Sequence, residues 1–206
     1  MTKEYAGRTA VITGAGSGLG AAMAGLFAQA GASVVLLDID GPRAEEQAAA
    51  LRAQGADAVA LAVDVADRAS LAAAATAVRE RCGPVHVLCA NVGVQQFGAI
   101  DALTGQDWQW VMGVNFHGVV QTVDAFLPLL RAAEGARHIV LTSSASFFQR
   151  GIRMAAYVAS KYAVTGYGEV LRDELAGEGI NVTLLFPAGM ATRPLESPNA
   201  ARPAEL

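Results

Sequence analysis

Short apolar runs alternate with longer stretches of helical pattern along most of this chain of 206 residues. Such runs are typical of strands buried on both faces of a parallel sheet, in which each crossover is usually a helix. Right-handed crossovers then favour an α/β fold, a doubly wound parallel sheet with helices on both faces. We expect strands at 10–13, 33–37, 59–63, 85–90, 137–142 and 180–186, and helices at 19–30, 42–54, 70–81, 108–130 and 154–177.

This pattern also predicts how the chain is organised. It runs without a linker, so we expect a single domain over 1–191, whereas 192–206 has little pattern and is expected to be a truncated or disordered C-terminal segment. Pro128 should end or bend the helix at 108–130, because proline lacks the N–H that a helix interior uses. Ligands of a doubly wound sheet bind beyond the carboxyl ends of its strands, so the loops there are where we expect chemistry.

The composition excludes several classes of protein. Hydrophobic residues make up 53% of the chain, which is too many for a disordered protein. The apolar runs are too short to cross a bilayer, so we expect no membrane partner. The net charge is −4 and lysine and arginine form no dense cluster, so we expect no nucleic-acid partner. The polar N-terminus lacks an apolar segment of the signal-peptide type, which predicts a cytoplasmic location.

Cysteine and histidine give no sign of a metal site. Cys82 and Cys89 match no metal or redox spacing, and Cys89 lies in an apolar run where we expect it to be a small buried hydrophobe. The histidines, His86, His117 and His138, are scattered along the chain. We therefore predict no metal.

The loop after the first expected strand is rich in glycine. It runs from Thr13 to Gly20 and opens the first expected helix. Glycines let a backbone turn tightly and approach a pyrophosphate, and a helix N-terminus favours its negative charge. A glycine-rich loop alone is a weak signal and can be an ordinary flexible loop, but its place between strand and helix is the one that dinucleotide binding requires. The candidate cofactor residues here are Gly14, Ser17, Gly18, Leu19 and Gly20.

Asp38 ends the second expected strand, where an acidic residue accepts hydrogen bonds from the adenosine ribose. A carboxylate there repels a 2′-phosphate, and neither Ser17 nor Ile39 supplies a positive charge to hold one. We therefore expect NAD(H) to be favoured over NADP(H), unless Arg43 swings toward the phosphate. The alternative for Asp38 is a helix N-terminal acid, a role that Asp40 fits better.

Polar residues and glycine also follow the third and fourth expected strands. Asp64 could hold the adenine amino group with Val65 packing nearby, and Asn91, followed by Gly93, could tie neighbouring strands together. Each of these residues could instead serve simple turn chemistry.

Tyr157 and Lys161 are four residues apart on an expected helix, which places them on one face. A nearby ammonium favours the phenolate and lowers the pKa of a tyrosine, so that the phenol can exchange a proton with an alcohol or ketone near neutral pH. Ser144 follows the fifth expected strand, so its hydroxyl can reach the same cleft and polarise a carbonyl. A lone Tyr-x-x-x-Lys pair is common and usually structural.

Taken together, these motifs resemble the short-chain dehydrogenase/reductase (SDR) family in order and spacing, over about the first nine-tenths of the chain. The resemblance implies a Rossmann-type fold and an NAD-dependent oxidoreductase. The residues that carry it are Thr13-Gly14-x-x-x-Gly18-x-Gly20, Asp64, Asn91-x-Gly93, Asn115, Ser143-Ser144 and Tyr157-Val-Ala-Ser-Lys161.

The resemblance implies a role at each matching position. Tyr157 would be the catalytic acid/base, and Lys161 would lower its pKa and hydrogen-bond the nicotinamide ribose. Ser144, rather than its neighbour, would orient the substrate oxygen. Asn115 would anchor a water in a proton relay behind Lys161. The segment from Pro187 to Thr192 would lie against the nicotinamide, with both of its end residues as cofactor contacts.

The match also fails in places. Ala90 and Val92 stand where the family often has Asn and Ala, and Ala188 stands where glycine usually follows proline. The chain stops soon after Thr192, where family members usually continue with a substrate-covering loop, a further helix and a last strand. We still expect a homodimer or homotetramer, because the helices at 108–127 and 157–175 form a subunit contact in the family.

The sequence specifies the substrate poorly. Apolar side chains near the expected cleft suggest an apolar alcohol or ketone, although they could equally line a subunit contact. Tyr162 and Tyr167 do not match the motif and are expected to pack. Two other functions stay open, a non-catalytic NAD-binding module that reports redox state and a lyase or dehalogenase-like enzyme on the same fold. The side chains near the cleft are Phe97, Phe147, Phe148, Met154 and Met190, with Gln95, Gln96, Gln149 and Arg150 as polar additions.

Overall fold

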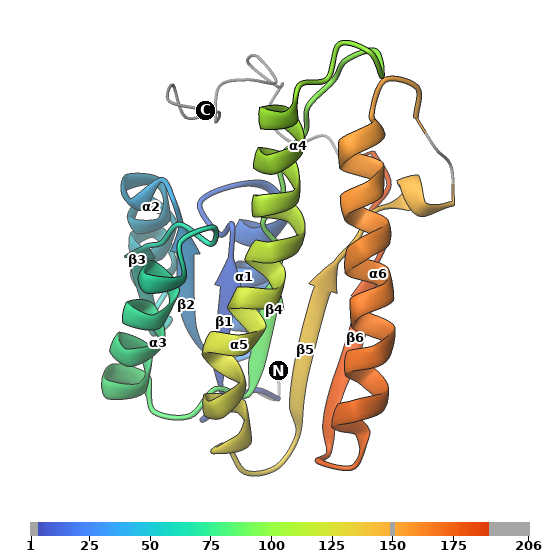
Figure 1. Cartoon of the computed structure of the whole chain (residues 1–206). Coiled ribbons are helices and arrows are strands. Elements are labelled where there is room, and N and C mark those ends of the chain that lie inside the picture. Colours follow the sequence, from blue (N-terminus) through green and yellow to red (C-terminus); the bar gives the residue numbers. More distant parts are fainter. Residues whose placement is uncertain (1–3, 149–150, 190–206) are drawn as a thin grey trace.

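The computed structural model describes residues 4–148 and 151–189 and confirms the predicted alternation of strands and helices (Figure 1). The six strands form one parallel sheet in the order β3-β2-β1-β4-β5-β6. The strands are β1 Thr9–Thr13, β2 Ser33–Asp38, β3 Ala58–Ala62, β4 Val87–Ala90, β5 Arg137–Thr142 and β6 Ile180–Leu185. The helices are α1 Gly18–Gln29, α2 Gly41–Ala53, α3 Arg68–Cys82, α4 Gly105–Met112, α5 Gly118–Arg131 and α6 Ala155–Ala176, with a π-helical turn, η1 Gly113–His117, and a 3₁₀ turn, η2 Ala145–Phe147.

The strand order reverses direction between β1 and β4, which lie side by side at the centre of the sheet. From β1 the chain first builds outward through β2 to β3, then crosses back to β4 and builds outward on the other side. This is the doubly wound, Rossmann-type arrangement, and the crevice at its point of reversal is where such sheets bind ligands.

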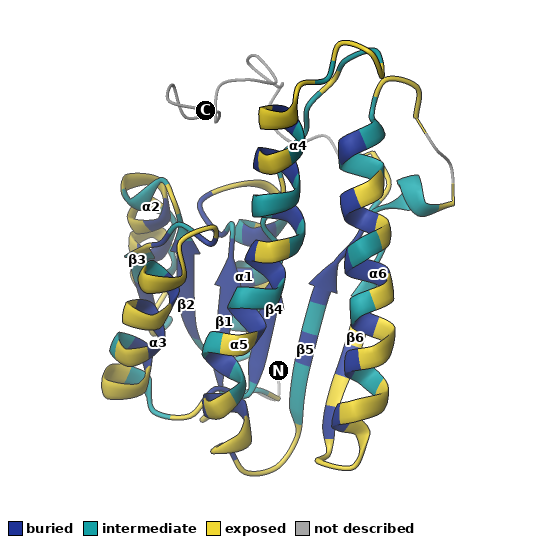
Figure 2. Cartoon of the chain, viewed as in Figure 1, coloured by how far each residue is buried: buried dark blue, intermediate teal, exposed yellow. Residues whose placement is uncertain are grey.

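The sheet is buried on both faces because successive side chains of a strand point to opposite sides. The buried apolar side chains form two large clusters, one on each face of the sheet. Val11, Val35 and Leu88 belong to the larger one, which packs under α3, α5 and α6. Ile12 and Leu36 belong to the second cluster, with the buried alanines of α1 and α2. Figure 2 shows the central strands as buried, while the helices turn exposed residues outward. The near-continuous apolar runs of the sequence are the consequence of these two cores.

The prediction of one long helix at 108–130 is wrong in two ways. The helix begins at Gly105, because Thr104 and Asp107 form a capping box in which the Thr104 hydroxyl accepts from the Asp107 N–H and the Asp107 carboxylate accepts from the Thr104 N–H. The π-helical turn then separates α4 from α5.

Pro128 does not end α5, which continues to Arg131. The proline lies in the last turn, where its ring costs the helix a single N–H bond and few residues follow. Its own carbonyl accepts the N–H of Ala132, which closes the helix. None of the helices within residues 4–148 and 151–189 has both the length and the apolar character needed to cross a membrane.

Candidate active site

Strands β1, β4 and β5 are tied together at their carboxyl ends by the side chain of Asn91. Its amide nitrogen donates to the Thr13 carbonyl over 3.3 Å, and its amide oxygen accepts from the Thr142 hydroxyl over 3.1 Å. The Thr13 hydroxyl in turn accepts the Asn91 N–H over 2.9 Å. The expectation that Asn91 ties neighbouring strands together is confirmed, and these hydrogen bonds hold the carboxyl ends of the three strands in place.

Lys161 points from α6 to the end of β5. Its Nζ donates to the main-chain oxygen of Thr142 over 2.9 Å, and the residue is only 2% exposed. The Ser143 hydroxyl donates to the Lys161 carbonyl over 3.1 Å and also bonds Thr165, which fixes the helix backbone against the strand. Burial lowers the pKa of Lys161 to about 8, because a charged ammonium loses its hydration there. At neutral pH the side chain is still mostly charged.

Tyr157 lies one helical turn before Lys161, as the spacing predicted. The ammonium is 5.8 Å from the centre of the phenol ring, and the ring is half-buried. The two side chains therefore lie on one face of α6, with the buried ammonium beside the phenol.

Ser144 begins the η2 turn directly after β5. Its Oγ accepts the N–H of Ser146 over 3.1 Å, so the oxygen is oriented while its own proton stays free to donate. The structure shows no direct hydrogen bond between the hydroxyls of Ser144 and Tyr157, both of which lie among the described residues.

Asn115 is fully buried in the π-helical turn. Its amide oxygen accepts the Val94 N–H over 2.7 Å, and its amide nitrogen donates to the Val94 carbonyl over 2.9 Å and to the Ser160 hydroxyl over 3.0 Å. That hydroxyl donates to the Tyr157 carbonyl over 2.7 Å. The side chain thus joins the loop after β4 to the first turns of α6. Both amide N–H groups are used in this way, and the relay water stays a prediction.

Gly93 leaves room beside the ammonium. A Cβ at this residue would lie 3.2 Å from the Lys161 Nζ and 3.7 Å from the Asn115 Oδ1. The backbone of this loop therefore lies directly against the buried end of Lys161. A larger residue at position 93 would crowd the ammonium, which is a reason for glycine there that the sequence did not show.

The glycine-rich loop lies tightly over the start of α1. Gly14 has a φ of +66°, a conformation that favours glycine, and a Cβ on Gly20 would stand 2.1 Å from the Gly14 carbonyl oxygen. Ser17 precedes α1 without a side-chain cap, and the first turn, which includes Gly18 and Leu19, contains no acidic residue. The first N–H groups of α1 therefore fit an anion such as a pyrophosphate.

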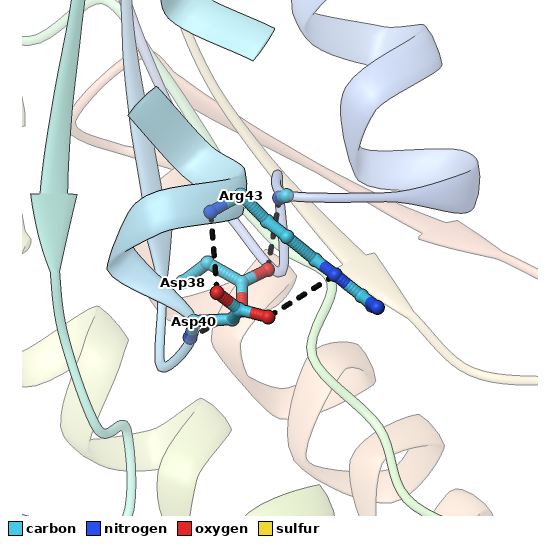
Figure 3. A network of polar contacts seen from close by, with 4 residues as sticks. Asp38, Asp40 and Arg43 are labelled. Carbon is cyan, nitrogen blue, oxygen red and sulfur yellow. Dashed lines mark hydrogen bonds and ion pairs between the residues drawn. The ribbon is translucent and has the colours of Figure 1, made fainter. Parts of the chain in front are cut away.

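Asp38, Asp40 and Arg43 form a polar network beside this loop (Figure 3). The Asp38 carboxylate accepts the Gly16 N–H over 2.8 Å and the Asp40 N–H over 3.0 Å. Asp40 caps α2 by accepting the Arg43 N–H over 3.1 Å, and its other oxygen pairs with the Arg43 Nε over 3.1 Å. Asp40 is therefore the helix N-terminal acid, as its position suggested, and Asp38 ends β2.

Three further predicted residues have local roles in the structure. Asp64 accepts the Ala66 N–H over 2.8 Å in a turn, and Val65 is buried with its side chain against Gly118 of α5. The carbonyl of Pro187, just after β6, accepts the Ala145 N–H over 2.9 Å. Whether these residues contact a cofactor stays a prediction. Thr192, Met190, Gln149, Arg150 and the predicted segment 192–206 lie outside the described residues.

A hollow of about 360 Å³ lies between the loop after β4 and the loop before α6. Two of its lining side chains are strongly exposed apolar groups, Ile100 at 79% and Ile152 at 91%. Met154 lines this hollow, whereas Phe147 and Phe148 pack against Phe186 instead. The lining residues are Gly98, Ala99, Ile100, Gly151, Ile152, Arg153, Met154 and Ala155.

The structure adds site residues that the sequence analysis did not assign. Thr142 accepts the Lys161 ammonium with its carbonyl and donates its hydroxyl to Asn91. The Ser160 hydroxyl accepts the amide of Asn115. The available signal was a polar residue at the end of a buried strand or on the inner face of a helix. Over the residues that the structure describes, no group of three or more metal-ligating side chains gathers.

Comparison with known proteins gives matches along nearly the whole chain. A family model described as short chain dehydrogenase matches residues 8–202. C alpha-dehydrogenase of Sphingobium sp. strain SYK-6 is 34% identical over 204 residues, which are 98% of this chain and 67% of that protein.

Solved structures agree with this match. A short chain dehydrogenase/reductase from Burkholderia phymatum in complex with NAD superposes with a TM-score of 0.88 at 39% identity, over 92% of this chain and 68% of that one. A metagenomic short-chain oxidoreductase in complex with NADP superposes with a TM-score of 0.85 at 31% identity, over 91% of this chain and 85% of that one.

Proposed function

The chain belongs to the short-chain dehydrogenase/reductase family of nicotinamide-dependent oxidoreductases, and we propose that it transfers a hydride between NAD(H) and an apolar secondary alcohol or ketone. One observation carries the proposal. The buried Lys161 ammonium, fixed to the Thr142 carbonyl, lies 5.8 Å from the centre of the Tyr157 ring at the carboxyl edge of the sheet. Burying a lysine charge costs free energy, and buried titratable groups with a shifted pKa gather preferentially at functional sites.

The chain's own residues supply position and proton transfer. Bound NAD(H) would supply or accept the hydride. In the reducing direction, Tyr157 donates its phenolic proton to the carbonyl oxygen, and the Lys161 ammonium stabilises the phenolate that remains. Ser144 donates a hydrogen bond to the same oxygen, since its Oγ is already oriented by the Ser146 N–H. In the oxidising direction the phenolate accepts the alcohol proton.

The residues present fit a dinucleotide. The uncapped start of α1 and the close approach of Gly14 and Gly20 suit the pyrophosphate, and Asp38 suits the adenosine ribose. We propose adenine contacts for Asp64 and Val65, and nicotinamide-side contacts for Asn91, Gly93, Lys161, Pro187 and Thr192.

The proposed preference for NAD(H) rests on this chain's own charges, because relatives have been solved with NAD and with NADP. Asp38 ends β2, and we propose that its carboxylate lies beside the adenosine ribose, where it would repel a 2′-phosphate. Arg43, the cation nearest to that place in sequence, is paired with Asp40 in the structure. An arginine already engaged with a carboxylate is a weaker partner for a phosphate.

The proposed substrate class rests on the hollow between the loops at 98–100 and 151–155. The second of these loops reaches Ala155, two positions before Tyr157 in the sequence. Its lining is almost entirely aliphatic, with Arg153 as the charged member. Such a surface favours an apolar body on the alcohol or ketone. The oligomeric state stays a prediction, which light scattering on the purified protein tests.

The test is a screen of ketones with NADH and of secondary alcohols with NAD, made with the wild type and the Tyr157→Phe variant. We expect turnover on apolar substrates by the wild type and none by the variant, with similar NADH affinity in fluorescence titration. Turnover by the variant would show that Tyr157 is not the catalytic acid/base. NADH binding without turnover on any substrate would favour the non-catalytic redox-reporting module instead.

A further inference from the structure

The turn that carries Ser144 is held at both ends. At its start, the Ala145 N–H donates to the Pro187 carbonyl over 2.9 Å, which ties η2 to the end of β6. At its far end, the hydroxyl of Tyr162 donates to the Phe147 carbonyl over 2.7 Å, which ties η2 to α6. In Figure 1 this short turn lies beside α6, after the end of β5.

Tyr162 belongs to the helix that also carries the proposed acid/base pair, and it directly follows Lys161. Its ring packs on Phe147 with centroids 4.5 Å apart and planes tilted by 33°, and Phe147 also contacts Phe186 at 5.6 Å. Tyr162 is 36% exposed, so burial alone does not oblige its hydroxyl to bond Phe147. The ring contact and the hydroxyl bond together join this side chain to the turn at two points.

We propose that Tyr162 is a positioning residue, which sets the place of the Ser144 hydroxyl relative to Tyr157 without touching the substrate. The inference rests on the proposed function of the site. Ser144 is oriented by the Ser146 N–H, an atom of η2, so a displacement of the turn moves its hydroxyl. The Tyr162 hydroxyl couples that turn to α6, and thereby to the phenol that shares the substrate oxygen with Ser144. Small displacements of such a donor reduce rates strongly.

The first test is kinetic. Tyr162→Phe removes the hydroxyl and keeps the ring, and we expect kcat/KM for the carbonyl substrate to fall about tenfold, with the NADH dissociation constant unchanged. In a Ser144→Ala background the same change should cause no further fall, because no hydroxyl remains to be positioned. A role in general stability would lower kcat/KM in both backgrounds. Tyr167→Phe, which alters another tyrosine of α6 whose ring packs on Phe116, is the matched control and should keep full activity.

The second test does not depend on activity. Hydrogen–deuterium exchange of the amides in 145–148 should be about fivefold faster in Tyr162→Phe than in wild type or Tyr167→Phe, with α6 unchanged. Unchanged exchange there, or a full kinetic effect that persists in the Ser144→Ala background, would overturn the proposal. A wild type without any reductase activity would instead refute the proposed function, and the exchange rates would still show whether the hydroxyl restrains the turn.

Discussion

The Lys161 Nζ and the main-chain oxygen of Thr142 are 2.9 Å apart, so the ammonium beside Tyr157 is anchored to backbone, and no acidic side chain within residues 4–148 and 151–189 pairs with it. A carboxylate partner would neutralise the charge that the phenol needs. A carbonyl oxygen orients the ammonium and leaves its full charge in place. The cost is desolvation, which lowers the pKa of Lys161 to about 8.

This cost predicts a pH-dependent stability. The folded pKa of Lys161 lies below its ordinary value of about 10.5, so between these values the unfolded chain binds more protons than the native one. The free energy of unfolding should therefore rise with pH across this window, by at most about 3 kcal/mol. Lys161→Met lacks this contribution. In urea denaturation, the stability of the variant relative to wild type should decline steadily from pH 7 to pH 10, and a pH-independent difference would contradict the buried charge.

Two glycines of α1 form a matched pair of variants. In Gly20→Ala the new Cβ would stand 2.1 Å from the Gly14 carbonyl oxygen, so backbone must move. We expect a loss of about 2 kcal/mol in stability and weaker NADH binding. Gly25→Ala meets nothing within 4 Å and should gain about 1 kcal/mol from helix propensity. Thermal denaturation and NADH titration measure both effects, and equal behaviour of the two variants would rule out the close approach of loop and helix.

Asp40→Asn should shift cofactor preference toward NADPH. Asparagine can still cap α2, but it loses the charge that pairs with the Arg43 Nε. A released Arg43 should improve the ratio of NADPH to NADH affinity by up to about fivefold, since exposed ion pairs are weak. Fluorescence titration with each cofactor gives the ratio. The Asp40→Asn, Arg43→Ala double variant is the control, and an equal shift there would exclude Arg43 as the cause.

Asn115→Ala should destabilise the protein by about 3 kcal/mol, because the Val94 N–H and carbonyl lose their buried partners. Gln109→Ala changes an exposed residue of α4 and should alter stability by less than about 0.5 kcal/mol. Urea denaturation compares the two variants. A small effect at Asn115 would mean that water replaces its amide, and the loop after β4 would then not depend on this side chain.

Local chemistry made much of the molecule predictable. Strands such as β5 and β6 were placed within a residue, because short runs with β-branched residues and leucine that follow a glycine favour a strand over a helix. The Tyr157–Lys161 pair followed from helix periodicity, and the glycine-rich loop from its place between strand and helix. The start of α4 was missed although Thr104 and Asp107 have the spacing of a capping box, which marks a helix N-terminus. The π-helical turn at Asn115 could not be predicted, because no residue pattern in the sequence marks it.

The sequence by itself determined which residues share a helix face or a strand end, since those relations involve neighbours a few positions apart. Only the tertiary structure decided that Lys161 is anchored by the Thr142 carbonyl and that Tyr162 bonds the turn after Ser144. The physical reason is that these contacts join main-chain atoms or flexible side chains, whose partners exist only once the sheet has brought β5, β6 and α6 together. Residue type and spacing carry no record of such a contact.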